Sequence, residues 1–232
     1  ILLEQDRKAI ILVATSGDTG SAVAQAFYEK KNIHVVILYP KGRVSVLQEK
    51  QLTTLGKNIH ALEVHGTFDD CQRLAKEAFC DSDLAEALTL TSANSINIGR
   101  LFPQSFYYVY AYAQLKQQLD DNLVFCVPSG NFGNLTAGIY AWTWGLPVNH
   151  FIAATNINDV VPEFLKTKKY SPRTSIQTLS NAMDVGNPSN FERMMTIFDH
   201  NGDKMAEMLH PEVVDDTQTK EMMYRIHDRK KI

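Results

Sequence analysis

Two glycine-containing turns carry residues that could hold an anionic ligand. Residues 16–20 (SGDTG) follow an apolar run at 9–14, and residues 129–133 (SGNFG) follow an apolar run at 123–127. Each run predicts a buried strand, and a helical pattern follows each turn. A helix N-terminus offers unpaired N–H groups and the positive end of the helix dipole, and glycines let the backbone approach a ligand closely. The two turns therefore predict a site that holds two anionic groups.

A third segment, residues 91–100 (TSANSINIGR), places hydroxyl and amide side chains before Arg100. Asn94, Ser95 and Arg100 are its candidate binding residues, because arginine is shaped for bidentate recognition of phosphate. Taken alone, the segment equally fits a polar helix cap followed by a surface arginine. The two glycine turns favour the phosphate site.

Other common sites are disfavoured by spacing. Neither glycine turn has the extra leading glycine of a dinucleotide fingerprint, and the Gly-Lys-Ser/Thr of a Walker loop is missing from the sequence. A nucleotide-binding Rossmann protein is therefore disfavoured. Residues 199–203 begin like a calcium loop, but the sixth position is Lys204 and the twelfth is His210, so we expect no metal site.

Composition limits the partners of the protein. The chain has 232 residues, with 23 Lys plus Arg against 26 Asp plus Glu, a net charge of −3. This balance argues against nucleic acid or an anionic membrane as a partner. Cys71, Cys80 and Cys126 are odd in number and lack CxxC spacing, which favours a reducing compartment and a cytoplasmic location. The chain begins at Ile1 and has no recognisable terminating element, so we expect a piece of a longer protein.

The first hundred residues alternate strands with helices. This alternation predicts an α/β fold, with a parallel sheet covered by helices on both faces, in a small domain over residues 1–100. Thr67 is expected to cap a helix, with Asp70 adding negative charge to its first turn. The other predicted elements are strands at 9–14, 34–39, 59–64 and 87–91 and helices at 21–31 and 44–55.

Residues 101–232 are expected to form part of a larger domain. A helix is predicted from Pro103, and residues 106–112 within it are apolar or aromatic all round. Such a helix packs either in the core or in a subunit interface, and the second alternative predicts a homodimer through residues 103–118. The other expected elements are strands at 123–127 and 148–154, helices at 135–144, 161–167 and 191–198, and an ordered loop at 178–190.

Taken together, residues 16–20, 94–100 (NSINIGR) and 129–134 (SGNFGN) resemble the threonine synthases. These are pyridoxal-phosphate-dependent enzymes of the tryptophan-synthase-β-like fold. Residues 153–159 (AATNIND) and 179–184 (LSNAMD) also resemble this family, and the similarity extends to about Phe198. The resemblance implies a two-domain α/β fold and pyridoxal 5'-phosphate as cofactor. It also implies conversion of O-phospho-L-homoserine and water to L-threonine and phosphate.

The resemblance also implies roles for single residues. Residues 129–133 would cradle the cofactor phosphate with help from Asn134, and Asp18 would lie near the phenolic oxygen of the cofactor. Residues 16–20 would face the substrate carboxylate, with Thr19 as a donor. The candidate cofactor-binding residues are Asp18, Ser129, Gly130, Asn131, Phe132, Gly133 and Asn134, and the candidate substrate-binding residues are Ser16, Gly17, Thr19, Gly20, Asn94, Ser95 and Arg100.

The chain departs from the family at the catalytic base. The Schiff-base lysine of the family lies in an Ala-Phe-Lys-Asp-like stretch well upstream of the first glycine turn, and none of the 15 residues before Ser16 forms it. Lys8 has the wrong neighbours. We therefore expect a central fragment with little or no activity. Two alternatives stay open: a related pyridoxal-phosphate-dependent phospho-lyase or Ser/Thr dehydratase, and a non-catalytic anion-binding or interaction module.

Overall fold

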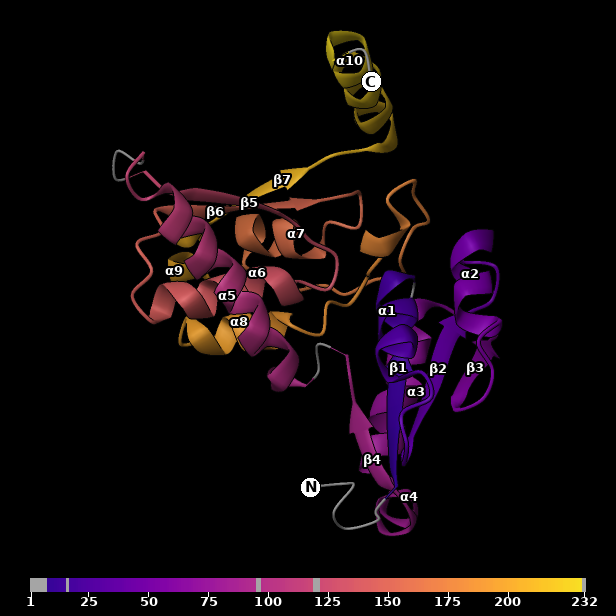
Figure 1. Ribbon diagram of the computed structural model, residues 1–232. Coiled ribbons are helices and arrows are strands. Elements are labelled where there is room, and N and C mark those ends of the chain that lie inside the picture. The colour runs from indigo at the N-terminus through magenta and orange to yellow at the C-terminus, as the bar shows by residue number, and fades with distance from the viewer. Residues whose placement is uncertain (1–7, 16, 95–96, 119–121, 231–232) are drawn as a thin grey trace. The chain divides into compact units, whose positions relative to one another are not determined.

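The structure is a computed structural model that describes residues 8–15, 17–94, 97–118 and 122–230 (Figure 1). It divides into two compact units, Ile1–Asn97 and Ile98–Ile232. The sequence places a domain boundary between residues 100 and 101. Whether these units are the domains of the full protein stays a prediction.

The first unit is built on a four-stranded parallel sheet in the order β3-β2-β1-β4. Both neighbours of β1 run parallel to it, with Ala9 opposite Ile33 in β2 and Thr89 in β4. Parallel strands need a crossover connection, which here is helical between β1 and β2. The strands are β1 (Ala9–Ala14), β2 (Ile33–Pro40), β3 (Ile59–Val64) and β4 (Thr89–Ser92).

Helices cover both faces of this sheet. Side chains alternate along a strand, so Ile11 and Val13 of β1 join one hydrophobic cluster while Leu12 and Ala14 join another. The first cluster contains residues of α1 (Asp18–Phe27) and α2 (Val46–Thr53), and the second contains residues of α3 (Phe68–Cys80). The predicted parallel sheet with helices on both faces is confirmed.

The start of α3 agrees with its predicted capping residues. The Thr67 hydroxyl accepts from the Asp70 N–H at 3.3 Å, and the Asp70 carboxylate accepts from the Thr67 N–H at 2.8 Å. A short helix not expected from the sequence, α4 (Ser82–Ala87), follows and is capped by Asp81. Six residues are too few for a clear apolar periodicity, which explains why it was missed.

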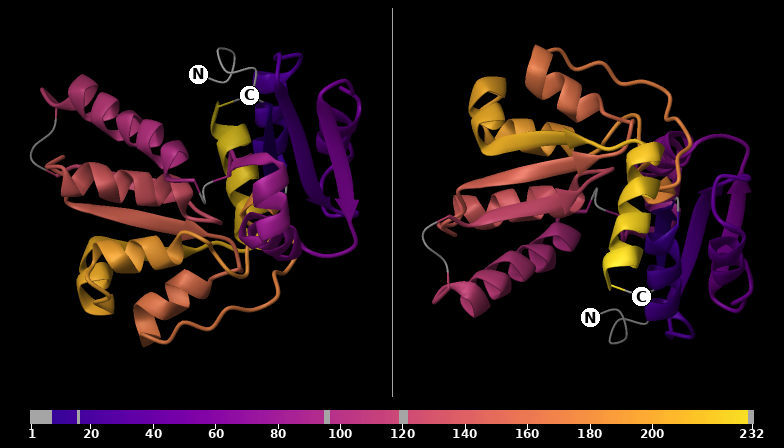
Figure 2. Two further views of the ribbon diagram at one scale, coloured as in Figure 1. Left: turned by 90° about the horizontal axis from the view of Figure 1, so that it is seen from below. Right: turned by 90° about the horizontal axis from the view of Figure 1, so that it is seen from above.

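The second unit has a three-stranded parallel sheet in the order β5-β6-β7. Figure 2 shows α5 and α6 on one side of this sheet and α7 and α9 on the other. Its elements are α5 (Ile98–Leu115), β5 (Val124–Pro128), α6 (Gly133–Thr143), β6 (His150–Thr155), α7 (Val160–Thr167), the 3-10 turn η1 (Asn181–Met183), α8 (Phe191–Ile197), α9 (Gly202–Met208), β7 (Leu209–Val213) and α10 (Asp216–Lys230).

Helix α5 begins five residues before the predicted start, at Ile98 instead of Pro103. Pro103 therefore lies inside the helix, where its missing N–H removes one bond of the helical ladder. One side of α5 carries the buried Leu101 and Tyr108, and Tyr108 belongs to the hydrophobic core of this unit. The other side is open in this chain, with Phe106 61% exposed and Tyr110 68% exposed.

Three elements beyond residue 198 were not expected: α9, β7 and α10. Strand β7 contains Pro211 and Glu212, which are unusual in a buried strand, but it lies at the edge of the sheet and pairs with β6. Helix α10 is polar, and most of its side chains are exposed. Among the described residues, we find no helix with the length and hydropathy needed to cross a membrane.

Candidate functional site

The turn at residues 129–133 connects the carboxyl end of β5 to α6. Ser129 is buried, its N–H donates to the Ala154 carbonyl at 2.7 Å, and its hydroxyl donates to the Val127 carbonyl at 3.0 Å. In an open α/β sheet, ligands bind beyond the carboxyl ends of the strands. Ser129 thus fixes where the turn leaves the sheet through both its backbone and its side chain.

The N-terminus of α6 has the chemistry that a phosphate needs. The first main-chain bond of the helix runs from the Thr136 N–H to the Phe132 carbonyl at 2.9 Å, so the N–H groups of Gly133, Asn134 and Leu135 precede the helical ladder. The first turn carries no acidic residue, and within the described chain no side chain caps this helix. An anion at this helix start is favoured by the dipole and meets no competing carboxylate in the turn.

Asn134 is held by a tyrosine that sequence analysis did not single out. The Tyr108 hydroxyl of α5 lies 2.7 Å from the Asn134 Oδ1 atom and 3.0 Å from the Asn134 carbonyl oxygen. Tyr108 is buried, and burial raises the pKa of its hydroxyl, so it remains a hydrogen-bond donor at neutral pH. Because an aromatic residue on a helix is usually read as core, no sequence signal separated Tyr108 from its neighbours.

The loop between α7 and α8 lies against the turn and is anchored to the end of β6. Asn156 and Asp184 are joined by a bond of 2.8 Å, and Thr178 donates to both carboxylate oxygens of Asp184 at 2.8 and 3.0 Å. Burial raises the pKa of the Asp184 carboxyl, and this effect exceeds the lowering by the Thr178 bonds. The segments 153–159 and 179–184, which the family resemblance singled out separately, therefore meet in one network.

The other glycine turn is organised by Thr15, a residue that sequence analysis did not select. Its hydroxyl oxygen accepts from the N–H groups of Gly17 and Gly20, each at 3.0 Å, and donates to the Gly17 carbonyl at 3.0 Å. A Cβ atom on Gly20 would lie 2.5 Å from the Thr15 methyl group, so glycine is required for this close approach. Two N–H groups expected to face a ligand are therefore used within the turn.

Asp18 is the first residue of α1 and lies close to α2. Its carboxylate accepts from the Gln48 side-chain amide at 3.0 Å, and Gln48 also forms a capping box with Ser45 at the start of α2. A carboxylate in this position already interacts with the positive end of the α1 dipole. A substrate anion at this turn would share that end with Asp18, unlike an anion at α6.

Asn94 lies beside the first turn, bonded to the end of β1. Its side chain accepts from the Ala14 N–H at 2.8 Å and donates to the Ala14 carbonyl at 2.6 Å, which extends the pairing of β1 and β4. Its predicted role in substrate binding stays a prediction, and it requires this pair of bonds to open or a contact through other atoms. Ser16 and Ser95, two further candidates, lie outside the described residues.

Arg100 lies in the first turn of α5, in the second unit. It is half-buried, and burial lowers the pKa of its guanidinium from the ordinary value. The structure thus groups residues 129–134 around the start of α6, and Gly17, Asp18, Thr19, Gly20 and Asn94 around the end of β1. That these two groups and Arg100 form one site stays a prediction.

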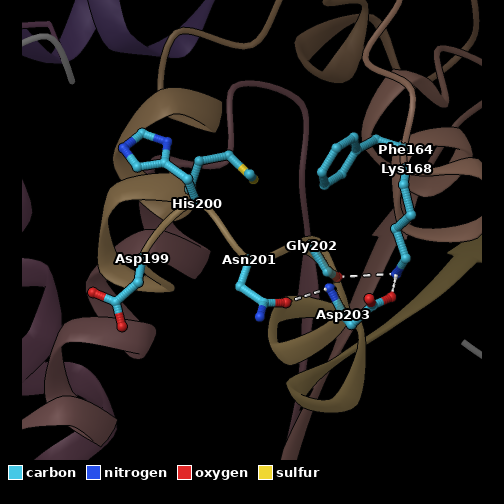
Figure 3. Close-up of a pocket in the computed structure, with 8 residues that line it drawn as sticks. Phe164, Lys168, Asp199, His200, Asn201, Gly202 and Asp203 are labelled. Carbon is cyan, nitrogen blue, oxygen red and sulfur yellow. Dashed lines mark hydrogen bonds and ion pairs between the residues drawn. The ribbon is translucent and has the colours of Figure 1, made fainter.

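A pocket of about 500 Å³ lies between the end of α7 and the segment that joins α8 to α9 (Figure 3). The Lys168 ammonium there donates to the carbonyls of Leu165 and Gly202 at 3.0 and 2.9 Å and contacts the Asp203 carboxylate at 3.2 Å. Figure 3 shows Asp199 and His200 on the other side of the pocket from Lys168. An ammonium has three N–H donors, and three acceptors surround the Lys168 ammonium. Lys168 therefore links the end of α7 to the start of α9.

The fold and the comparison with known families define the class of the protein. The family described as pyridoxal-phosphate dependent enzymes matches residues 2–232, and the chain belongs to that family. That residues 129–134 at the start of α6 hold the cofactor phosphate stays a prediction. Within the part of the chain that the structure describes, no cluster of three or more His, Cys, Asp or Glu side chains is arranged to hold a metal.

Particular relatives within this family are threonine synthases. Over 88% of its own length, the chain is 55% identical to threonine synthase of Haemophilus influenzae, and the match covers 48% of that relative. The match to a crystal structure of threonine synthase from Escherichia coli covers 97% of this chain and 53% of the crystallised chain, with 51% identity and a TM-score of 0.91. A PLP-bound threonine synthase from Brucella melitensis matches 92% of the chain with 35% identity and a TM-score of 0.74.

These matches confirm the resemblance that the three segments indicated and the two-domain α/β fold of that enzyme class. The chain spans about half the length of the curated relatives it matches.

Proposed function

We propose that the full protein containing residues 1–232 is a threonine synthase. In this proposal it converts O-phospho-L-homoserine and water to L-threonine and phosphate with pyridoxal 5'-phosphate. The observation that carries the proposal is the similarity to threonine synthases, at 55% identity for the Haemophilus influenzae protein and 52% for the Escherichia coli protein. A cytoplasmic location is part of the proposal and rests on the three free cysteines.

The bound cofactor supplies the electron sink for the reaction. We assign its phosphate to residues 129–134, because the α6 N-terminus has N–H donors and no acidic residue in its first turn. We assign the substrate carboxylate to residues 16–20, with Thr19 as a donor and Asp18 toward the cofactor. We assign the substrate phosphate to Asn94, Ser95 and Arg100, where the guanidinium can bind it in bidentate fashion.

The chain itself is expected to form no threonine. The lysine that would hold the cofactor covalently belongs, in this proposal, to a part of the protein outside residues 1–232. Purified chain 1–232 and the full protein should be given O-phospho-L-homoserine and pyridoxal phosphate, with threonine and phosphate both measured. We expect equimolar products from the full protein and neither from the chain.

The same assay separates the alternatives. Phosphate release by the full protein without threonine would favour another phospho-lyase, and ammonia formation from serine or threonine would favour a dehydratase. Turnover by the chain alone would show that the catalytic lysine lies within it, and loss of that turnover in Lys8→Ala would identify Lys8. Failure of the full protein to use any of these substrates would favour the non-catalytic module.

We also propose that the open side of α5 is an interface between two copies of the full protein. What supports this is its exposed aromatic surface. Tyr107 is 70% exposed, and the ring centroid of Phe102 lies 5.1 Å from that of Trp144, the residue that follows α6. Sedimentation of the full protein should give a dimer, and Tyr110→Glu should give a monomer. A monomeric wild-type protein would contradict the interface and indicate that the rest of the same chain covers α5.

A further inference from the structure

Asn190 is a fully buried residue that lies 59 positions after Asn131 and contacts the turn at residues 129–133 directly. Its Nδ2 atom donates to the Asn131 carbonyl at 2.8 Å, and its Oδ1 atom accepts from the Arg193 guanidinium at 2.8 Å. Because both ends of the amide are paired with groups of known polarity, its orientation is defined. Sequence analysis did not select Asn190, which precedes α8 as its N-cap residue.

The bond to Asn131 fixes the direction of a neighbouring N–H group. A trans peptide is planar, with its C=O and N–H pointing in opposite directions, so a bond that holds the Asn131 carbonyl also orients the Phe132 N–H away from Asn190. The next peptide is held in the same way, because the Phe132 carbonyl accepts from the Thr136 N–H at 2.9 Å and from the Thr136 hydroxyl at 2.7 Å. Two consecutive N–H groups of the turn therefore have set directions.

The conformation that these bonds hold is an uncommon one. Phe132 has φ of 58° and ψ of 14°, in the left-handed region, while its ring is buried in the core. For a residue other than glycine this costs about 1–2 kcal/mol. Such a conformation persists when the surroundings over-determine it, and it is found at ligand-binding turns.

Further contacts from the same segment hold the turn from outside. The Asn131 Oδ1 atom accepts from the Ser189 N–H at 2.6 Å, and the Asn131 Nδ2 atom donates to the Ser189 hydroxyl at 2.9 Å. A Cβ atom on Gly130 would lie 2.6 Å from the Met183 Cα atom, so the two backbones are in close contact. The Asn131 side chain is therefore directed at Ser189, and the turn is left to bind its ligand through its backbone.

We propose that Asn190 is a positioning residue for the cofactor phosphate: it holds the Asn131–Phe132 peptide so that the backbone N–H groups at the start of α6 are oriented for the phosphate. This inference rests on the proposed function. It assigns a role in phosphate recognition to a side chain that acts through the backbone of the turn.

The test compares ligands with and without the phosphate. The full protein is titrated with pyridoxal 5'-phosphate and with pyridoxal, following cofactor absorbance, and the phosphorus NMR shift of the bound phosphate is recorded. Asn190→Ala should weaken binding of the phosphorylated ligand about tenfold, roughly the effect of one hydrogen bond, and leave pyridoxal binding unchanged. Its phosphorus resonance should also move from the wild-type position.

Asn201→Ala is the matched control. Asn201 is the N-cap residue of α9, and its side chain accepts from the N–H groups of Asp203 and Lys204, each at 3.0 Å. This variant should lose stability without a change in phosphate preference. If Asn190→Ala does not fold, Ser189→Ala takes its place. It should weaken binding of pyridoxal 5'-phosphate by about two- to threefold and leave pyridoxal binding unchanged, because it removes one hydroxyl contact.

Equal losses for both ligands would overturn the inference, and so would a wild-type protein that does not prefer the phosphorylated ligand. A wild-type protein that prefers the phosphorylated ligand but forms no threonine would contradict only the proposed function. In that case the selective loss in Asn190→Ala would still support the positioning role.

Discussion

At the level of single residues, the side chains that shape the two turns are mostly not the ones expected to touch a ligand. Thr15 accepts from two backbone N–H groups in the first turn, and Asn190 donates to a backbone carbonyl in the second. Both residues act on the backbone of a turn: Thr15 uses two of its N–H groups, and Asn190 holds one of its carbonyls. Sequence alone identified the turns, because glycine next to a buried strand is a local signal. It did not identify Asn190, because that contact depends on a fold that joins residues 59 positions apart.

A first prediction concerns Thr15. Thr15→Val keeps the shape of the side chain but leaves the N–H groups of Gly17 and Gly20 without their acceptor in a buried turn. We expect the free energy of unfolding in urea to fall by about 2 kcal/mol. Thr53→Val is the control, since its hydroxyl bonds to the Glu49 carbonyl at the exposed surface of α2. Equal losses in the two variants would contradict the role of Thr15.

A second prediction concerns the pH dependence of stability through Asp70. Bonds from the Thr67 N–H and hydroxyl lower the pKa of its carboxyl below the ordinary value. The folded state therefore binds this proton more weakly than the unfolded state. Its stabilising effect is present above the ordinary pKa of aspartate and is lost as the pH falls through the folded-state pKa.

Asp70→Asn tests this sign. At pH 7 we expect its free energy of unfolding to be about 0.5 kcal/mol below that of the wild type, since a charge is lost from the first turn of α3. The difference in the free energy of unfolding should shrink toward zero below about pH 4, which is near the ordinary pKa of an aspartate carboxyl. Urea denaturation at a series of acid pH values measures it. Glu221→Gln on the exposed helix α10 should show no such trend. A difference that grows in acid would contradict the lowered pKa.

At the level of elements, α5 and α6 pack closely because α6 has a glycine at their contact. A Cβ atom on Gly138 would lie 2.6 Å from the Tyr108 ring and 2.9 Å from the Phe151 ring. Tyr108 in turn packs edge-on against Phe125, with the ring centroids 4.8 Å apart. The same tyrosine that bonds to Asn134 is thus fixed by the packing of the two helices on the sheet.

A third prediction follows for this contact. Gly138→Ala should lower the free energy of unfolding by about 2 kcal/mol, because a methyl group is forced into a filled space. In a Tyr108→Leu background, which shortens the opposing side chain, the same change should cost much less. Thermal melts of the four variants in this cycle measure the coupling. Strictly additive losses would show that the two residues do not compete for space.

The sequence predicted some elements much better than others. Strands β1, β2 and β3 are rich in apolar and β-branched residues, and their positions were correct to within a residue at each end. Helix α4 and strand β7 were missed, because they are short and mix polar with apolar residues. The predicted start of α5 was wrong. Pro103 was placed in the first turn because proline favours that position, but the helix begins five residues earlier, at Ile98.

At the level of the whole molecule, stability is expected to be uneven. Helix α6 has six buried residues among eleven, whereas the described side chains of α10 are exposed or only partly buried. A fourth prediction is that amides of α10 exchange with deuterium much faster than those of α6, since an isolated helix of this length is marginal in water. Mass spectrometry of peptic peptides measures both. Equal protection would indicate a packing partner for α10.

The candidate site also has features that the sequence predicted and features that it did not. The two glycine turns were readable, because each lies between a predicted strand and a predicted helix that are adjacent in sequence, and their binding of anions stays a prediction. The engagement of Asn94 with Ala14 was not readable, since these residues are 80 positions apart and the amide would serve a phosphate equally well.

The strand order β3-β2-β1-β4 also has a consequence for synthesis on the ribosome. The β1 strand can pair with β2 soon after both leave the exit tunnel, but its other edge stays uncovered until β4 and Asn94 have been made. During that interval the nascent chain exposes the apolar edge strand β1 with unpaired backbone groups. Chaperones can bind this edge, and strands of neighbouring nascent chains can pair with it.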